Sequence, residues 1–286
     1  MSSGADRGFE VGSPESFRKS WNALDLSERY HFSRSLPETQ IQFAFQNHWR
    51  VFRSVLGPVT SGRVLEVGCG RGSMAAFFAD AGYEVHLLDT STVALDIAQR
   101  NFETDGLRGY AVAGDALNLP YVDQKFDVCV SIGLLEHFAE IEPVLIEQMR
   151  VLRKGGVLLA YVVPERPLSA QVLGAPLNML LRLRRCFKGL PASRSTKAPL
   201  YRNRFRSRDY LEVLQRSGVG ASGAFGMFPL PLISHSPTFP FSSNEPWIER
   251  RIVQAWSRIL SLRDRKKDAW ICAEGWGLAF LVWAVK

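Results

Sequence analysis

Short apolar runs alternate with segments of helical periodicity through the middle of this 286-residue chain. The runs are mostly aliphatic and β-branched, and they lie at 63–67, 84–89, 110–114, 126–132 and 151–159. In the last run, Gly155 and Gly156 predict a turn between the end of a helix and the strand. Predominantly apolar runs of this length are typical of parallel strands buried on both faces, and such strands need connecting helices. The pattern therefore predicts an α/β fold whose sheet carries helices on both faces.

A helix is also predicted before the first strand. Residues 38–55 give it a broad apolar surface that includes Phe43 and Trp49. This surface would pack on the sheet or close over a bound ligand. We therefore expect residues 1–60 to form an N-terminal helical cover and residues 61–286 to form the main domain.

More elements follow the fifth strand than a minimal α/β sheet requires. They are an amphipathic helix, a Gly-, Pro- and Ser-containing loop, a helix, a strand, a tryptophan-containing helix and a final strand, at 177–187, 189–200, 209–218, 223–230, 246–262 and 277–284. We expect two insertions, a cap at 165–208 and a helical insertion at 240–268. The cap would lie at the carboxyl ends of the strands, where open α/β sheets bind ligands.

The first strand leads into a loop with glycines at alternate positions, Gly68, Gly70 and Gly72. Glycine lets a backbone turn sharply and approach a ligand, because no Cβ stands in the way. The helix predicted from Ser73 would direct its first amide groups at that ligand. Dinucleotide loops have the spacing Gly-x-Gly-x-x-Gly, whereas here the third glycine comes one residue earlier. The loop thus indicates a nucleotide-type ligand, with a tight strand-to-helix turn as the alternative.

Acidic residues end the next two strands. Asp89 closes the second strand, where a carboxylate can accept hydrogen bonds from both hydroxyls of a ribose. Asp115 follows the third strand. Either acid alone could be an ordinary helix N-cap, since Asp is favoured at that position. In combination with the glycine loop, the two acids favour a nucleotide-type site.

The sequence Glu66-x-Gly68-x-Gly70-x-Gly72 resembles motif I of the class I S-adenosylmethionine-dependent methyltransferases, and the later landmarks over 63–163 follow that family's order. The likeness is to the small-molecule and lipid type, the methyltransferase type 11 group. It implies a Rossmann-like sheet and S-adenosyl-L-methionine as the cofactor, whose methionine end carries an ammonium group and no phosphate. An acid near the loop suits that ammonium. The cofactor-binding residues that the resemblance implies are Glu66, Gly68, Cys69, Gly70, Gly72, Asp89, Thr90, Asp115, Ala116 and Ser131.

After the fourth strand, residues 131–138 resemble the Leu-Glu-His element of small-molecule and lipid methyltransferases. That group includes ubiquinone-type O-methyltransferases and the cyclopropane fatty acid synthase group. The resemblance implies methyl transfer, most often to oxygen, and leaves transfer to carbon open. An oxygen nucleophile needs its proton removed, so Glu136 and His137 are the candidate catalytic residues. Helix capping or hydrogen bonding to a neighbouring group is the alternative role for His137.

The net charge of +7 belongs to one segment. Residues 167–208 contain ten basic residues and no acid, so the rest of the chain is net negative. Leu180, Leu181 and Phe187 lie among these charges, and together they favour an acceptor that is anionic and apolar, or contact with an anionic membrane. A solvated loop is the alternative. Two other functions stay open: an RNA methyltransferase that contacts phosphate through this segment, and a non-catalytic cofactor-binding regulator. Nucleic acid is the less favoured partner.

Other sequence features favour a cytoplasmic enzyme, at most peripheral to a membrane. The four cysteines have neither paired nor metal-ligand spacing, so we expect reduced thiols and no metal site. The first residues lack the apolar core of a signal peptide. No segment reaches the ~18 uninterrupted apolar residues of a membrane-spanning helix.

Overall fold

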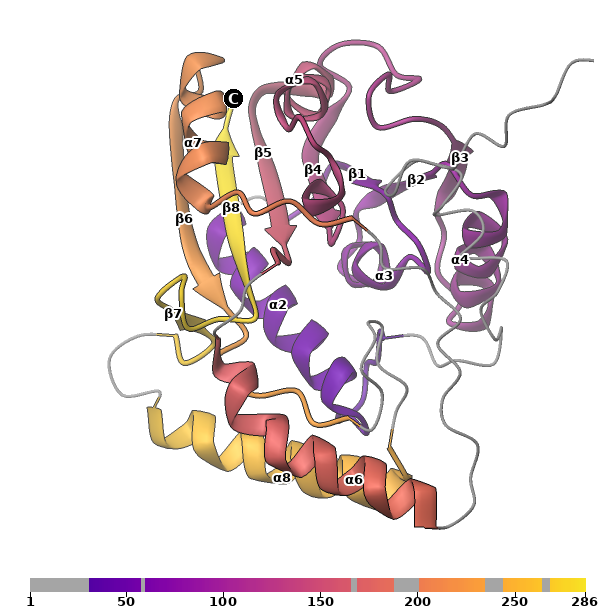
Figure 1. The fold of residues 1–286 in the computed structure, drawn as a ribbon. Coiled ribbons are helices and arrows are strands. Elements are labelled where there is room, and N and C mark those ends of the chain that lie inside the picture. The colour runs from indigo at the N-terminus through magenta and orange to yellow at the C-terminus, as the bar shows by residue number, and fades with distance from the viewer. Residues whose placement is uncertain (1–30, 58–59, 166–168, 188–200, 235–243, 264–267) are drawn as a thin grey trace, which may run out of the picture.

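The computed structural model describes residues 31–57, 60–165, 169–187, 201–234, 244–263 and 268–286. Within them the strands form one 8-stranded sheet in the order β3-β2-β1-β4-β5-β8-β6-β7, with helices on both faces (Figure 1). The strands are β1 Arg63–Val67, β2 Glu84–Asp89, β3 Tyr110–Ala113, β4 Phe126–Ile132, β5 Leu152–Val162, β6 Ala221–Met227, β7 Ile271–Cys272 and β8 Ala279–Val285. The predicted α/β fold is confirmed.

The sheet is parallel over its first five strands and antiparallel beyond them. β1 pairs in parallel with β2 on one side and with β4 on the other. The strand order therefore changes direction between β1 and β4, which makes this a topological switch point. Open α/β sheets bind ligands at the carboxyl ends of the strands beside such a point. β8 pairs antiparallel with both β5 and β6, so it closes the gap between them.

Two apolar cores lie on the two faces of the sheet. The first contains side chains of α2 (Gln40–Leu56), α3 (Ser73–Asp80) and α4 (Thr92–Thr104). The second contains side chains of α5 (Glu142–Val151) and α7 (Ser207–Arg216). The helices on both sides bury β1, β2 and β4 along almost their whole length.

The helix before β1 packs on the sheet with the surface that its apolar positions predict. Thr39 caps α2 by accepting a hydrogen bond from the amide of Gln42. Phe43 and Phe52 are buried in the first core, and Trp49 packs partly buried against it. The indole of Trp270 donates a 2.9 Å hydrogen bond to Nδ1 of His48, which attaches α2 to the chain just before β7.

The glycine pair at 155 and 156 does not form the turn expected before the fifth strand. Strand β5 runs without interruption from Leu152. Gly155 adopts φ +73 inside the strand, and its amide donates to the carbonyl of Lys286. Gly156 has no room for a side chain, because an added Cβ would lie 2.9 Å from the carbonyl oxygen of Arg153. The glycines therefore permit a local irregularity in β5 where the register against β4 shifts.

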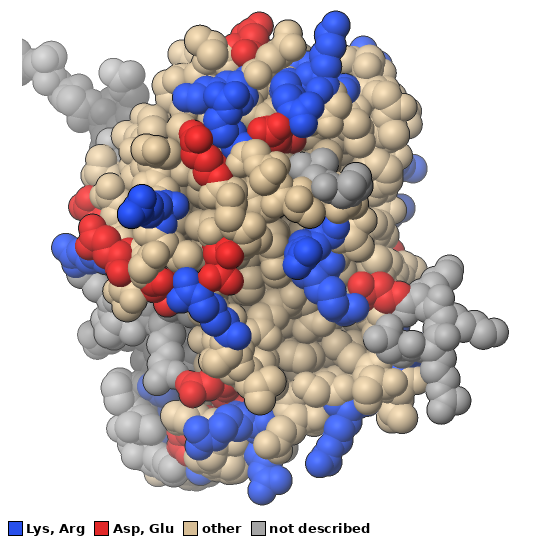
Figure 2. All heavy atoms as spheres, turned by 180° about the vertical axis from the view of Figure 1, so that it is seen from behind, with Lys and Arg blue, Asp and Glu red and all other residues tan. Residues whose placement is uncertain are grey.

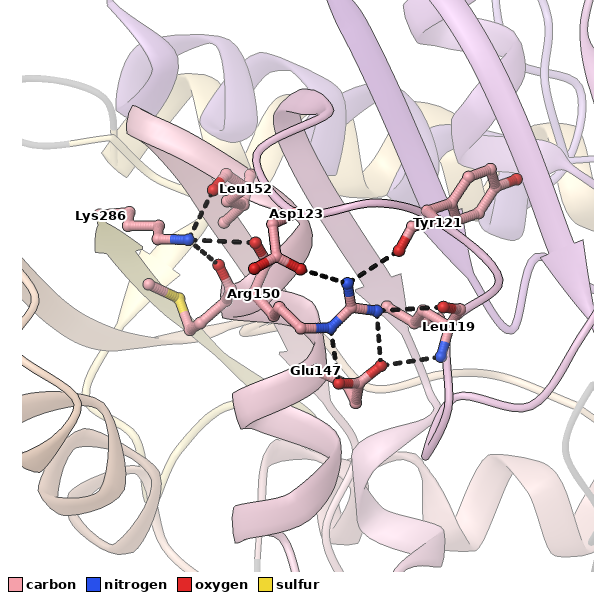
Figure 3. Close-up of polar contacts among 8 residues, drawn as sticks. Leu119, Tyr121, Asp123, Glu147, Arg150, Leu152 and Lys286 are labelled. Carbon is pink, nitrogen blue, oxygen red and sulfur yellow. Dashed lines mark hydrogen bonds and ion pairs between the residues drawn. The ribbon is translucent and has the colours of Figure 1, made fainter.

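Charged side chains connect the segments at the amino-terminal ends of the parallel strands (Figure 3). The guanidinium of Arg150 donates to both carboxylate oxygens of Glu147 at 2.8 and 2.9 Å and to Asp123 at 2.7 Å. It also donates to the carbonyls of Tyr121 and Leu119. The ammonium of Lys286 donates to the carbonyls of Met149, Arg150 and Leu152. This network joins the end of α5 to the β3–β4 connection and to the end of β8.

The segment after β5 forms part of a helical layer beyond the carboxyl end of that strand (Figure 1). It contains η2 (Ala170–Gly174) and α6 (Ala175–Phe187), and α8 (Pro246–Arg263) lies in the same layer. The loop predicted at 189–200 lies outside the described residues. None of the helices in the described ranges is both long and apolar enough to cross a lipid bilayer. All four cysteines are free thiols.

Candidate functional site

The loop after β1 adopts a conformation that glycine favours. Gly68, Gly70 and Gly72 have φ of +69, +53 and +69. A Cβ on Gly68 would lie 2.8 Å from Cδ1 of Leu134, and one on Gly72 would lie 3.1 Å from the ring of Phe102. The loop can therefore follow this path only with small residues at these positions.

Asp89 joins the glycine loop to the end of β2. Its Oδ2 accepts a 3.0 Å hydrogen bond from the amide of Gly70, and its Oδ1 accepts one of 2.9 Å from the amide of Ser91. Ser91, not Asp89, is the N-cap of α4. The carboxyl is buried, and burial raises its pKa. A carboxylate offers more acceptor sites than these two amides occupy, so it can still receive hydroxyl donors.

Glu66 performs a local task that the sequence did not indicate. Its Oε2 accepts a 2.8 Å hydrogen bond from the amide of Ala75, in the first turn of α3. The N-cap of α3 is Gly72, which has no side chain to offer, so Glu66 caps the helix from the adjacent strand. Burial raises the pKa of Glu66 to about 8, and the neighbouring Asp89 adds to the shift.

The other residues implied by the resemblance lie along the same edge of the sheet. Cys69 is buried, and its amide donates to the carbonyl of Leu88. Thr90 follows Asp89 directly and is half-buried. Asp115 is exposed one strand further out, where its Oδ1 accepts a 2.9 Å hydrogen bond from the amide of Leu117, and Ala116 is buried beside it. No helix follows Asp115 directly, so this acid is not an N-cap either.

Several buried polar atoms at this edge lack a hydrogen-bond partner in the described part of the chain. They are Oγ of Ser73, Oγ of Ser131 and Oε2 of Glu136. Ser131 lies beside Val67 in the sheet, next to the glycine loop. Buried polar groups are seldom left without partners unless a ligand or water supplies them. The loop, the acids and these atoms fit a polar, nucleoside-containing cofactor such as S-adenosyl-L-methionine.

Glu136 and His137 lie in a short 3₁₀ turn, η1 (Leu135–His137), and α5 begins only at Glu142. The ring nitrogens of His137 face the backbone carbonyls of Tyr201, at 2.6 Å from Nδ1, and of Gly133. Burial lowers the pKa of His137 to about 4, although both carbonyls oppose that shift. The imidazole is therefore neutral at neutral pH.

Glu136 has the opposite electrostatic character. Its side chain is 1% exposed, and burial raises its pKa to about 7, partly opposed by the charge of Arg202. Burial raises the pKa of Tyr161 on β5, and the neighbouring carboxyl of Glu136 adds to the shift. Glu136 can therefore hold or release a proton near neutral pH, as a general acid or base must.

Asn203 positions this turn, and sequence reasoning missed it. Its amide nitrogen Nδ2 donates to the carbonyls of Leu135 and Phe138, both at 2.9 Å, and its backbone amide donates to the carbonyl of Glu136. The residue is buried, and its Oδ1 lies 3.4 Å from the hydroxyl of Tyr210. The last part of the predicted cap is therefore attached directly to the turn that carries the candidate catalytic residues.

An aromatic cluster between α2 and β5 was also missed. The ring of His48 lies 4.4 Å from that of Tyr161, 5.6 Å from that of Trp270 and 6.1 Å from that of Phe228. Burial lowers the pKa of His48 to about 3. These residues come from widely separated parts of the sequence, so no local pattern could have grouped them.

Acids from elsewhere in the chain balance part of the basic segment. Arg184 lies 3.7 Å from Glu245, and Arg204 lies 3.2 Å from Glu165. Arg208 lies 3.6 Å from the adjacent Asp209. The charge of the segment is thus less continuous in space than it is in the sequence.

The comparisons with known proteins agree with this geometry. A family model described as a methyltransferase domain matches residues 65–160. An O-methyltransferase of Aspergillus nomiae, rstn1, is 28% identical over 65% of this chain and 82% of its own length. A fatty-acid O-methyltransferase of Mycolicibacterium smegmatis is 34% identical, over 41% of this chain. The chain spans only 44% of that second relative.

A solved structure shares the fold. It is phosphoethanolamine N-methyltransferase 2 of Haemonchus contortus, in complex with phosphomonomethylethanolamine and S-adenosylhomocysteine, with a TM-score of 0.51 and 19% identity. The alignment covers 84% of this chain and 52% of that one. The fold, the glycine loop, the acids at the strand ends and the family match all indicate the same kind of domain. Residues 65–160 therefore form a methyltransferase domain of the class I S-adenosylmethionine-dependent kind, for which S-adenosyl-L-methionine is the cofactor.

Proposed function

We propose that this methyltransferase transfers the methyl group to an oxygen atom of an apolar small-molecule or lipid-linked acceptor. The observation that carries the proposal is the buried carboxyl of Glu136, whose Oε2 has no partner among the described residues and whose pKa is raised to about 7. A group of this kind beside the cofactor-binding edge suits the removal of a proton from an acceptor hydroxyl.

The cofactor-binding roles are part of the proposal. The loop of Gly68, Gly70 and Gly72 would hold the methionine end and Asp89 the ribose, while Asp115 and Ala116 would contact the adenine. Glu66, which caps α3, would lie near the ammonium. When bound, S-adenosyl-L-methionine supplies a methyl group attached to a positively charged sulfur. The neutral thioether that remains after transfer is an excellent leaving group.

Glu136 is the stronger candidate for proton removal, and His137 the weaker one. The imidazole of His137 faces two carbonyls and has a lowered pKa, so it is a poor proton acceptor and holds the turn in place. The hydroxyl proton of the acceptor would pass to Oε2 of Glu136 as the oxygen bonds to the methyl carbon. The bond from the methyl carbon to the sulfonium sulfur would break with its electron pair left on sulfur, so that S-adenosylhomocysteine is the second product, and the proton would pass later from Glu136 to solvent.

The apolar acceptor is supported by the fatty-acid O-methyltransferase among the relatives. The RNA alternative has less support, because Arg184, Arg204 and Arg208 lie beside acids. Retention of a titratable Glu136 argues against a non-catalytic regulator. A cytoplasmic location stays a prediction.

The test uses S-adenosyl-L-methionine labelled in its methyl group, with phenols, alcohols and fatty acids of increasing chain length as acceptors. We expect label in the organic phase and a rate that rises with pH up to about 7. Glu136→Gln should lower the rate by roughly 100-fold or more and leave S-adenosylhomocysteine affinity unchanged. His137→Gln should retain the pH dependence. Unchanged rate and pH profile in Glu136→Gln would contradict the base assignment, and label only in RNA would contradict the acceptor class.

A further inference from the structure

Helix α6 directs most of its large apolar side chains away from the protein. Asn178 and Leu181 lie on the half-buried side, and the amide of Asn178 binds the chain at 232–234 through hydrogen bonds with the Leu232 carbonyl and the Ser234 amide. The opposite side carries exposed large apolar residues: Met179, Leu180, Leu183 and Phe187. Phe187 is 88% exposed. A surface helix of a globular protein normally has the reverse arrangement.

Helix α8 lies beside α6 and has a more ordinary inward side, formed by Glu249, Val253 and Leu260, all buried. Its outward residues include Trp247, 53% exposed, and Leu262, 75% exposed. The guanidinium of Arg184 on α6 lies 5.6 Å from the ring of Trp247, which joins the two helices at this end.

The exposed charge of the two helices is of one sign. Helix α6 contains no acid, and the only acid within α8 is Glu249, which is buried. The two helices carry exposed or half-buried arginines at Arg182, Arg184, Arg185, Arg250, Arg251, Arg258 and Arg263. Seen from behind, basic side chains project along the lower edge of the molecule, where this layer lies (Figure 2). The layer therefore combines apolar side chains with cations.

We propose that the outward side of α6 and α8, defined by Leu183, Phe187, Trp247 and Leu262, docks on an anionic lipid membrane. A helix that lies in a membrane interface buries an apolar side in the acyl boundary and keeps arginines at the headgroups. Tryptophan and arginine are favoured at that depth. An anionic membrane uses the apolar residues and the exposed arginines together, although Arg184 also lies beside Glu245, whereas a second copy of this chain would bring like charges together.

The docking is independent of the proposed function, because it needs neither cofactor nor acceptor. If both hold, a lipid acceptor would reach the site from the membrane side, since the layer lies beyond the carboxyl end of β5 (Figure 1).

Co-sedimentation with phosphatidylcholine vesicles, with and without phosphatidylglycerol, tests the docking on the full chain. We expect binding to the anionic vesicles alone, weakened by salt. Replacement of Arg182 and Arg184 by Gln should lower the partition coefficient by about 30-fold, from about 1 kcal/mol per arginine. Leu183→Glu with Phe187→Glu should abolish binding.

Two matched controls keep the result specific. Arg100→Gln with Arg108→Gln removes the same charge from exposed positions in and after α4, and Val122→Glu alters an exposed apolar residue between β3 and β4. Both should bind vesicles as the unaltered chain does, and circular dichroism should be native in all variants. Equal binding by the α6 variants and the controls would overturn the proposal, as would indifference to lipid charge.

The chain also has a natural reporter on this surface. Cys186 on α6 is exposed, while Cys69 and Cys129 are buried and Cys272 can be replaced by Ser. A polarity-sensitive fluorophore on Cys186 should shift to the blue with anionic vesicles. An unshifted probe together with a concentration-dependent dimer in solution would assign the surface to a second copy and refute the membrane.

Discussion

The amide of Gly70 donates a 3.0 Å hydrogen bond to Oδ2 of Asp89, so the glycine loop after β1 and the acid that ends β2 form one structural unit. Neither residue type explains the site alone. The glycine supplies the left-handed backbone that directs its amide at the carboxylate, and the carboxylate holds the loop while it keeps lone pairs for a ligand.

Removal of this carboxylate should weaken cofactor binding. Asp89→Ala loses charge-assisted hydrogen bonds, and we expect S-adenosylhomocysteine to bind ~1.5–3 kcal/mol less tightly. Isothermal calorimetry measures the change. Asp96→Ala, which alters an exposed acid on α4, is the matched control and should bind normally. Equal affinity in the Asp89 variant would remove this residue from the ribose position.

A side chain in the glycine loop should block the cofactor. Gly70 has φ +53, so Gly70→Val adds both backbone strain and bulk at the loop. We expect loss of S-adenosylhomocysteine binding with nearly native far-UV circular dichroism. Gly106→Val is the control for backbone strain alone, because Gly106 has φ +64 but open space around it. This variant should bind S-adenosylhomocysteine normally. Normal binding by Gly70→Val would make the loop a turn only.

The buried carboxyl of Glu136 should make the protein less stable as pH rises. Its pKa is about 7 in the folded protein against 4.5 as a free group, so between these values the unfolded chain loses its proton first. The contribution of Glu136 to the free energy of unfolding should fall across this window by about 3 kcal/mol and level off above it, while Glu66, whose pKa is raised to about 8, continues the overall fall at higher pH. Urea denaturation over a pH series should show a smaller fall in Glu136→Gln. Glu140→Gln, which alters an exposed carboxyl, serves as the control. If stability falls as steeply with pH in Glu136→Gln as in Glu140→Gln, the assignment of the fall to Glu136 is contradicted.

Loss of the Asn203 side chain should disturb catalysis more than cofactor binding. Asn203→Ala removes the two donors that hold the carbonyls of Leu135 and Phe138, and with them the position of Glu136. We expect kcat to fall about 10-fold or more, with S-adenosylhomocysteine affinity unchanged and stability lower by ~1–3 kcal/mol. Asn118→Ala, at an exposed position, should change none of these. A rise in KM without a fall in kcat would show that the residue shapes the acceptor site.

The hydrogen-bond network of Arg150, at the amino-terminal ends of the parallel strands, should affect stability and not cofactor binding. Arg150→Met removes the donors shown in Figure 3 and should lower the free energy of unfolding by about 2–3 kcal/mol. Cofactor affinity should not change, because the cofactor-binding residues follow the carboxyl ends of the strands. Thermal denaturation and calorimetry of the same sample check both statements. Weaker cofactor binding in the folded variant would show that the two edges are coupled.

Much of the sheet was predictable because its strands are marked locally. The bounds of β1, β2 and β4 agree with the apolar runs, since a glycine or an acid follows where burial ends. The helix at 246–263 was predictable for a similar reason, because apolar positions recur at helical spacing after Pro246.

Other features depend on contacts that no local pattern contains. Asn203 is one polar residue in a basic segment, and only the fold brings it against η1. The apolar spacing of α6 predicted an amphipathic helix but not which side would face the protein. The role of Glu66 as a cap depends on the distance between β1 and the first turn of α3. The two-residue strand β7 is too short to leave a signal.

The position of β8 has a consequence for synthesis on the ribosome. This strand pairs with β5 and β6, yet it follows both in the chain. While residues 279–285 are still within the exit tunnel, β5 and β6 have emerged with unpaired edges, and such edges readily pair with other chains. The antiparallel half of the sheet therefore has to fold after translation of this strand, and a nascent chain stalled before it would be a natural client for a chaperone.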